Sequence, residues 1–143
     1  MKILIDADGC PVTRLTHRIA SERGIECVIF CDTAHEFDLP GTEVVTVSTG
    51  ADSADFALVN RASAGDIVVT QDWGLAALCL ARGARPIDQN GRLYTDENIG
   101  GMLEARCASA KLRRAGVRMK GQSRRQRAQD ADFEASLIGL LKI

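Results

Sequence analysis

Short apolar runs alternate with longer amphipathic segments along the first two thirds of the chain. The apolar runs are rich in Val and Ile, as strands buried on both faces of a sheet usually are, and they occupy residues 2–6, 26–31, 43–47 and 66–70. Segments with apolar residues at helical spacing occupy residues 11–24, 50–63 and 73–83. Because these strands alternate with helices, we expect βαβ units and an α/β fold with a mostly parallel sheet.

The last third of the chain has a different pattern. Residues 85–95 predict a short edge strand and a turn, and a helix is expected over residues 96–115. A connector rich in Gly and Arg then leads to a final amphipathic helix from Asp130. We therefore divide the chain into an α/β domain, residues 1–116, and a basic connector with a C-terminal helix, residues 117–143, which packs on or extends from the same domain.

Composition agrees with a single domain. With 143 residues, 45% of them hydrophobic and 26% charged, the chain is long enough for one core. No segment reaches the roughly 18 uncharged apolar residues of a membrane span, and Asp6 interrupts the first apolar run, so we expect a cytoplasmic protein. The 5 cysteines include no C-x-x-C pair, which favours reduced thiols over disulfides or a zinc site.

Charge is distributed unevenly along the chain. Residues 1–104 contain 8 Lys and Arg against 16 Asp and Glu, whereas residues 105–143 contain 10 against 3. Residues 106–127 include no acid, and a basic stretch of this kind favours binding to phosphate groups. We therefore expect a nucleic-acid partner, with RNA favoured over DNA. The basic residues expected to contact it are Lys111, Arg113, Arg114, Arg118, Lys120, Arg124 and Arg125.

Aspartates gather at the predicted strand ends. Asp6 and Asp8 follow the first strand, and Asp72 follows the fourth. Since the carboxyl ends of parallel strands lie at one edge of a sheet, these three acids should reach the same edge. Asp52 and Asp55 lie at the start of the helix before the fourth strand, where a spacing of three residues puts them on one helical face.

A cluster of these acids needs a cation. Carboxylates that meet within about 4–6 Å repel one another, which raises their pKa values and costs stability. Mg²⁺ or Mn²⁺ removes that cost, because both ions prefer oxygen ligands. The sequence thus predicts a metal site formed by Asp6, Asp8, Asp52, Asp55 and Asp72. A second interpretation stays open for Asp8, Asp52 and Asp72, each of which is placed to serve as the N-cap of a helix.

Four motifs resemble those of the YaiI/YqxD-like family of bacterial proteins, whose members lack an assigned function. They are DADGCP (6–11), GADSADFALVN (50–60), TQDWGLA (70–76) and NGRLYTDENI (90–99), and the likeness covers nearly the whole chain. That family is in turn similar to PIN-like nucleases. The resemblance implies a single-domain, three-layer α/β/α fold with a mostly parallel sheet, and hydrolysis of phosphodiester bonds with Mg²⁺ or Mn²⁺.

The resemblance also implies roles for individual acids. Asp6 corresponds to the acid that ends the first strand, Asp52 or Asp55 to the acid of the central helix, and Asp72 to the acid after the fourth strand. Asp8 fits an accessory ligand. This chain departs from many PIN proteins in having Asp in place of Glu in the central helix, and its basic C-terminal extension lies outside the PIN core. The catalytic residues implied are Asp6, Asp8, Asp55 and Asp72.

Two other functions remain open besides a metal-dependent nuclease. One is a non-catalytic module that binds nucleic acid through the basic stretch. The other is a phosphatase similar to the haloacid dehalogenases, because LIDADGC resembles their D-x-D motif. Such a phosphatase needs a lysine between the second strand and Asp72, and the only lysines are Lys2, Lys111, Lys120 and Lys142. The sequence has no G-x-G-x-x-G motif for a dinucleotide cofactor, and a homo-oligomer formed through a sheet edge or the last helix stays open.

Overall fold

The computed structural model describes most of the chain. Its described residues are 1–8, 10–32, 39, 41–47, 53–100 and 125–142. Within this part of the chain, no helix combines the length and the apolarity needed to cross a membrane. The four cysteines in this part form no disulfide, and three of them, Cys27, Cys31 and Cys79, are buried, as expected for reduced thiols.

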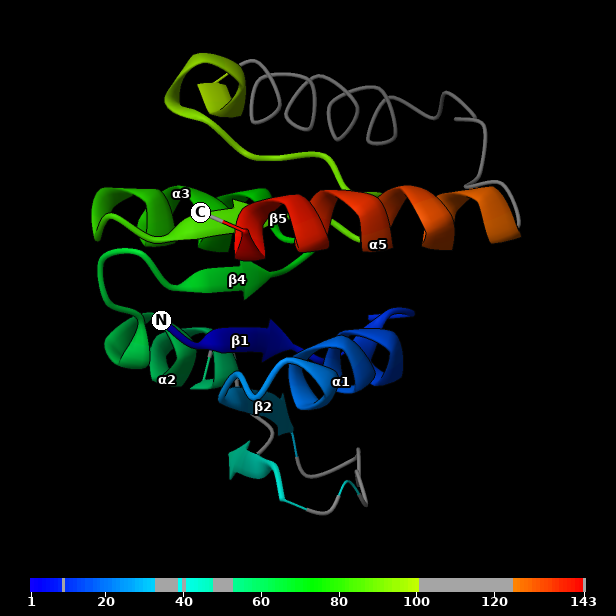
Figure 1. Cartoon of the computed structure of the whole chain (residues 1–143). Helices are drawn as coiled ribbons and strands as arrows, with labels where there is room; N and C mark the ends of the chain where they lie inside the picture. Colours follow the sequence, from blue (N-terminus) through cyan, green and yellow to red (C-terminus); the bar gives the residue numbers. More distant parts are fainter. Residues whose placement is uncertain (9, 33–38, 40, 48–52, 101–124, 143) are drawn as a thin grey trace, which may run out of the picture.

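Five parallel strands form one sheet in the order β3-β2-β1-β4-β5 (Figure 1). The strands are β1 (Ile3–Asp6), β2 (Cys27–Asp32), β3 (Glu43–Val47), β4 (Ile67–Val69) and β5 (Arg85–Ile87). All four pairings are parallel, so the prediction of an α/β fold with a mostly parallel sheet is confirmed. The predicted edge strand is β5, which also makes one antiparallel bridge between Ile87 and Leu93.

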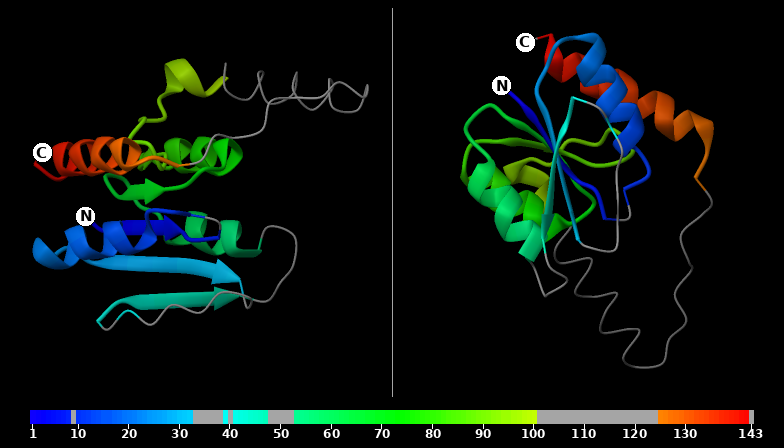
Figure 2. Two further views of the ribbon diagram at one scale, coloured as in Figure 1. Left: turned by 90° about the vertical axis from the view of Figure 1, so that its right-hand side faces the viewer. Right: turned by 90° about the horizontal axis from the view of Figure 1, so that it is seen from below.

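Helices lie on both faces of the sheet (Figure 2, right). They are α1 (Thr13–Glu22), α2 (Ser53–Arg61), α3 (Trp73–Ala81) and α5 (Arg127–Leu141). Helices α1 and α5 pack on one face, and α2 and α3 pack on the other. Residues 96–100 are helical as predicted, and the rest of that predicted helix lies outside the described residues.

Two helices begin at residues other than those predicted. Helix α1 begins at Thr13, after Pro11, because residues 11 and 12 form a turn. Helix α5 begins three residues before Asp130, because Gln126 and Gln129 form a reciprocal capping box at its start. The sequence pattern does not reveal this capping box, since glutamine is not among the residues that usually cap a helix.

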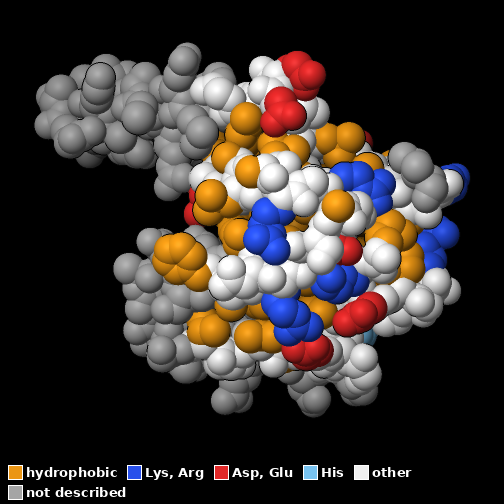
Figure 3. Space-filling view, turned by 90° about the vertical axis from the view of Figure 1, so that its left-hand side faces the viewer, with side chains coloured by type: hydrophobic (Ala, Val, Ile, Leu, Met, Phe, Trp, Pro, Cys, Tyr) orange, Lys and Arg blue, Asp and Glu red, His pale blue; other side chains and the backbone are white. Residues whose placement is uncertain are grey.

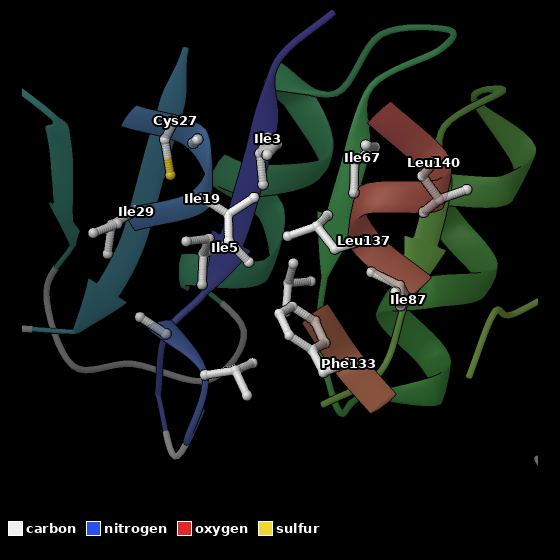
Figure 4. Packing of buried hydrophobic residues seen from close by; sticks show 14 of the residues in the cluster. Ile3, Ile5, Ile19, Cys27, Ile29, Ile67, Ile87, Phe133, Leu137 and Leu140 are labelled. Atoms are coloured by element: carbon white, nitrogen blue, oxygen red, sulfur yellow. The ribbon is translucent and has the colours of Figure 1, made fainter. Parts of the chain in front are cut away.

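The central strand β1 is buried on both faces. Ile3 and Ile5 belong to the core cluster under α1 and α5, whereas Leu4 belongs to the cluster under α2 and α3. All three side chains are 0% exposed, which explains why the strand reads as an unbroken apolar run. Figure 4 shows Phe133 and Leu137 of α5 packed against the side chains that project from the face covered by α1 and α5.

The C-terminal helix is also joined to the turn after β5. Gly91 in this turn has a φ of 86°, and its α-carbon lies close to α5. A Cβ atom at this position would come within 2.6 Å of the Asp132 carbonyl oxygen and 2.7 Å of Ser136 Oγ. The turn and the helix can therefore approach this closely only because residue 91 has no side chain.

Replacement of this glycine should loosen the contact between the turn and α5. We expect Gly91→Ala to lower the free energy of unfolding by about 2–4 kcal/mol, because left-handed strain adds to a clash with the helix. Gly65→Ala is the matched control: Gly65 has a φ of 87°, and a Cβ atom added there would meet nothing within 4 Å. The control should lose only the strain, about 1–2 kcal/mol, in urea denaturation. Equal losses would contradict close packing at Gly91.

Candidate active site

The acids at the carboxyl edge of the sheet lie at the ends of two neighbouring strands from which the chain continues to opposite faces of the sheet. After β1 the chain passes to α1 on one face, and after β4 it passes to α3 on the other face. Because β1 and β4 are neighbours, this is the switch point at which open parallel sheets bind ligands. Asp6 ends β1, and Asp72 lies between β4 and α3.

Thr70 links these two aspartates directly. Its hydroxyl donates a hydrogen bond to Asp6 Oδ2 at 2.9 Å and accepts one from the backbone N–H of Asp72 at 3.0 Å. Thr70 is only 1% exposed, so its side of this link is shielded from water. The structure therefore brings Asp6 and Asp72, which are 66 positions apart in the sequence, to one place.

Asp72 also caps helix α3. Its Oδ1 atom accepts hydrogen bonds from the backbone N–H groups of Gly74 at 2.8 Å and Leu75 at 3.2 Å. The N-cap interpretation of Asp72 is thus confirmed. A carboxylate has two oxygens with about four lone-pair sites, so capping through one oxygen is compatible with ligand binding through the group as a whole.

Asp8 does not cap helix α1. The N-cap position of α1 is Val12, and this helix end has no side-chain capping bond, so the N-cap interpretation of Asp8 is wrong. The helix starts too far along the chain for that role, because a turn closed by the bond from Cys10 N–H to the Ala7 carbonyl comes first. Asp8 lies in this turn, half-buried and two residues after Asp6.

Cys10 responds to charges on both sides of this turn. Burial raises the pKa of its thiol, and the nearby Asp6 carboxylate raises it further. A hydrogen bond with Thr13 and the positive charge of Arg125 act in the opposite direction. The raised pKa keeps this thiol uncharged at neutral pH.

The acids of the central helix are less completely described. Asp55 belongs to α2, whose first turn follows β3 and therefore lies at the carboxyl edge, but its side chain lies outside the described part. Asp52 lies entirely outside the described residues. Among the residues that the structure describes, no group of three or more His, Cys, Asp or Glu is arranged to hold a metal ion. Asp6, Asp8 and Asp72 thus do not form such a group by themselves.

Arg125 is engaged inside the molecule. Its guanidinium donates to Asp130 Oδ1 at 2.7 Å, to Asn90 Oδ1 at 2.8 Å and to the Gln89 carbonyl at 2.6 Å. These contacts join the start of α5 to the turn after β5. The other basic residues expected to bind nucleic acid lie outside the described part of the chain: Lys111, Arg113, Arg114, Arg118, Lys120 and Arg124.

The amino edge of the sheet is held by ion pairs. Lys2 contacts Asp66 at 2.7 Å, and Arg61 contacts Glu43 at 2.8 Å. Figure 3, which views the side where the strands begin, shows basic, acidic and hydrophobic side chains interspersed. Lys2 is therefore at the wrong edge to serve the phosphatase alternative, which needs a lysine beside the acids that follow β1.

Sequence reasoning overlooked the role of Thr70. The signal lies in the T-x-D spacing of residues 70–72, in which a hydroxyl precedes a helix N-cap by two residues. A Thr at this spacing can accept the N–H of the cap residue, as it does here. What the pattern does not reveal is the bond from the same hydroxyl to Asp6, which depends on the pairing of β4 with β1.

Comparison with known proteins gives a family but no activity. Residues 4–143 match the model of the family described as "Uncharacterized BCR, YaiI/YqxD family". A UPF0178 protein of Exiguobacterium sibiricum is 55% identical over 99% of this chain and 96% of its own length. UPF0178 proteins of Clostridium acetobutylicum and Lachnoclostridium phytofermentans are 43% and 42% identical, each over 99% of this chain and 97% of their own lengths. No solved structure matches this chain significantly.

Loss of the Thr70 hydroxyl should weaken the fold at the site. We expect Thr70→Val to lower the free energy of unfolding by about 1–3 kcal/mol, because the Asp72 N–H loses a buried acceptor and Asp6 loses a donor. Thr70→Ser keeps the hydroxyl and removes one methyl group, so its loss should stay near about 1 kcal/mol. Urea denaturation of both variants tests this, and a larger loss for the serine variant would contradict the link.

Proposed function

The chain belongs to the YaiI/YqxD family, and from the geometry of its site we propose that it is a metal-dependent nuclease with a PIN-like, three-layer fold. The proposed reaction is hydrolysis of phosphodiester bonds, in RNA in preference to DNA. The observation that carries the proposal is the Thr70 hydroxyl link, which brings Asp6 and Asp72 together at the switch point of the sheet. Helices on both faces of an all-parallel sheet support the PIN-like arrangement.

The chemistry of the donor set fits Mg²⁺ or Mn²⁺. Asp6, Asp8 and Asp72 offer carboxylate oxygens, which both ions prefer over nitrogen or sulfur. The first turn of α2 adds Asp55 from a third segment, and Asp52, three positions earlier in the sequence, belongs to the same proposed set. Ligating carboxylates are typically oriented by further hydrogen bonds, and Asp6 and Asp72 both accept such bonds here.

The residues of the chain have separate tasks in the proposed reaction. A bound Mg²⁺ or Mn²⁺ would supply a water of lowered pKa and would neutralise charge on the phosphate. The Thr70 hydroxyl keeps Asp6 oriented as a hydrogen-bond acceptor, and the first-turn amides of α3 do the same for Asp72. Asp8, two residues after Asp6, has the proposed role of an accessory ligand. No side chain acts as a nucleophile in this scheme.

Charge along the sequence supports a nucleic-acid substrate. An acidic body alone would repel a phosphodiester, whereas residues 105–143 carry 10 Lys and Arg against 3 Asp and Glu. Arg125 is the least suited of the predicted residues to these contacts, because its guanidinium is already bound to Asp130, Asn90 and Gln89. The remaining six basic residues retain the proposed role, and their contacts with phosphates would make binding weaken as salt rises.

A binding module without catalysis is the second candidate. It is favoured by one observation: the capping bonds of Asp72 give this acid a structural reason to be present. In that case the chain would bind nucleic acid through its basic residues and would release it uncut. Catalysis and binding are therefore measured separately in the test that follows.

Cleavage should require both the metal and the linked acids. We expect the purified chain to cut labelled single-stranded RNA in Mn²⁺ or Mg²⁺ and to stop in EDTA. Asp6→Asn and Asp72→Asn should each lower kcat/KM at least about 100-fold, because loss of a carboxylate ligand exceeds the 10- to 100-fold cost of losing its hydrogen-bonded support. The exposed Asp132 on α5 provides the matched control, and Asp132→Asn should retain activity.

Other outcomes of the same assay point elsewhere. Metal-independent binding of RNA, with no cleavage in any condition, would refute the nuclease and support the binding module. Hydrolysis of p-nitrophenyl phosphate without cleavage of RNA or DNA would support the phosphatase. Cleavage that persists at full rate in Asp6→Asn would show that the activity does not come from this site.

A further inference from the structure

The hydroxyl of Tyr94 is buried directly behind the Thr70 link. It donates a hydrogen bond to the Thr70 carbonyl oxygen at 3.2 Å, and the residue is 3% exposed. Burial raises the pKa of the phenol, and the charges of Asp88 and Asp72 raise it further. Tyr94 is therefore neutral at physiological pH and keeps the proton that it donates. A side chain buried in this way does not reach a substrate, so it acts through the residues that it contacts, and of these Thr70 forms the link between the acids.

Thr70 is held from the side of β5. Its backbone N–H donates to the Ile87 carbonyl at 3.1 Å, and its backbone carbonyl accepts from Tyr94. Both polar groups of its backbone are thus bonded away from β1, while its side chain is bonded to Asp6 of β1. Because threonine is β-branched and stiff at χ1, a fixed backbone also restricts the direction of its hydroxyl.

Tyr94 is itself fixed by the same edge of the sheet. Its backbone N–H donates to the Pro86 carbonyl at 3.0 Å, and the preceding residue, Leu93, bridges to Ile87. Its ring packs in a small apolar cluster with Ala76 of α3. The cluster also includes the partly buried side chains of Trp73, Leu80 and Ile99. The phenol therefore approaches Thr70 from a position that several elements determine.

We propose that Tyr94 is a positioning residue for the acid pair. The Tyr94 hydroxyl fixes Thr70, and Thr70 in turn fixes the orientation of Asp6 relative to Asp72. Its effect on turnover rests on the proposed nuclease function, whereas its effect on Thr70 does not. Tyr94 thus extends the site to the strand β5 and the segment that follows it, neither of which supplies an acid to the predicted cluster.

Tyr94→Phe tests the proposal, because it keeps the ring and removes the hydroxyl that donates to the Thr70 carbonyl. We expect kcat for RNA cleavage in Mn²⁺ to fall about three- to tenfold, while KM stays within about twofold, because the acids are misplaced and the substrate contacts are not. In the same variant, three-bond NMR couplings of Thr70 should change from a single χ1 rotamer to an average over several.

Ile67→Val is the matched control for loss of stability. Ile67 is fully buried at the start of β4, three residues before Thr70, and the substitution removes one buried methylene group from the core. This variant should keep the wild-type kcat and a single Thr70 rotamer. A Thr70 rotamer that is unchanged in Tyr94→Phe would overturn the proposal, and so would an equal loss of kcat in Ile67→Val.

The rotamer measurement separates the two proposals. If the wild-type chain cuts no nucleic acid but Thr70 loses its single rotamer in Tyr94→Phe, the nuclease function fails and the positioning of Thr70 stands. If the wild-type chain is active and the rotamer does not change, the nuclease function stands and Tyr94 has no part in it.

Discussion

Burial of β1 on both faces is the constraint on which the rest of the structure depends. Ile3 and Ile5 must be covered from one side and Leu4 from the other, and a parallel sheet achieves this only with helices on both faces. The chain supplies α1 and α5 to one face and α2 and α3 to the other. The C-terminal helix is therefore part of the core, since its Phe133 and Leu137 are 0% exposed and belong to the same cluster as Ile3 and Ile5.

This arrangement also determines where the polar residues gather. A strand that is apolar on both faces has no place for a carboxylate along its length, so the acids appear where the strand ends. After the neighbouring strands β1 and β4, the chain continues to helices on opposite faces. The segments that follow the two strands therefore separate at one position. The buried Thr70 lies at that position and forms hydrogen bonds with Asp6 and with the backbone of Asp72.

The sequence predicts this fold well wherever a single local pattern decides the outcome. The apolar runs identify four of the five strands that pair in parallel, and the runs of β1 and β4 are unbroken because both strands are buried. The expected starts of α1 and α5 are wrong, because they depend on a turn and on an unusual glutamine capping box. The cap expected at Asp8 fails for the same reason: the position of a helix end is only weakly encoded near a turn.

The site is predicted less completely, because its parts meet only in the folded chain. The placement of Asp6 and Asp72 at one edge follows from the alternation of strands and helices. This alternation predicts a parallel sheet, in which the carboxyl ends of the strands lie together. The bridging role of Thr70 and the support from Tyr94 do not follow, since each needs a contact between segments that are separated in the sequence. The local sequence also fails to identify the internal role of Arg125. Within a run of basic residues, no local pattern distinguishes the one that binds Asp130 inside the molecule.

The kind of donor that orients the two acids bears on what they can bind. Asp6 accepts from a hydroxyl, and Asp72 accepts from two backbone amides at the positive end of a helix. These neutral groups orient the carboxylates without cancelling their charge. An Arg or Lys donor in the same place would compensate that charge and weaken the attraction for a cation. Orientation by these particular donors is compatible with the proposed divalent ion, and it gives the buried Thr70 a structural role between the two acids.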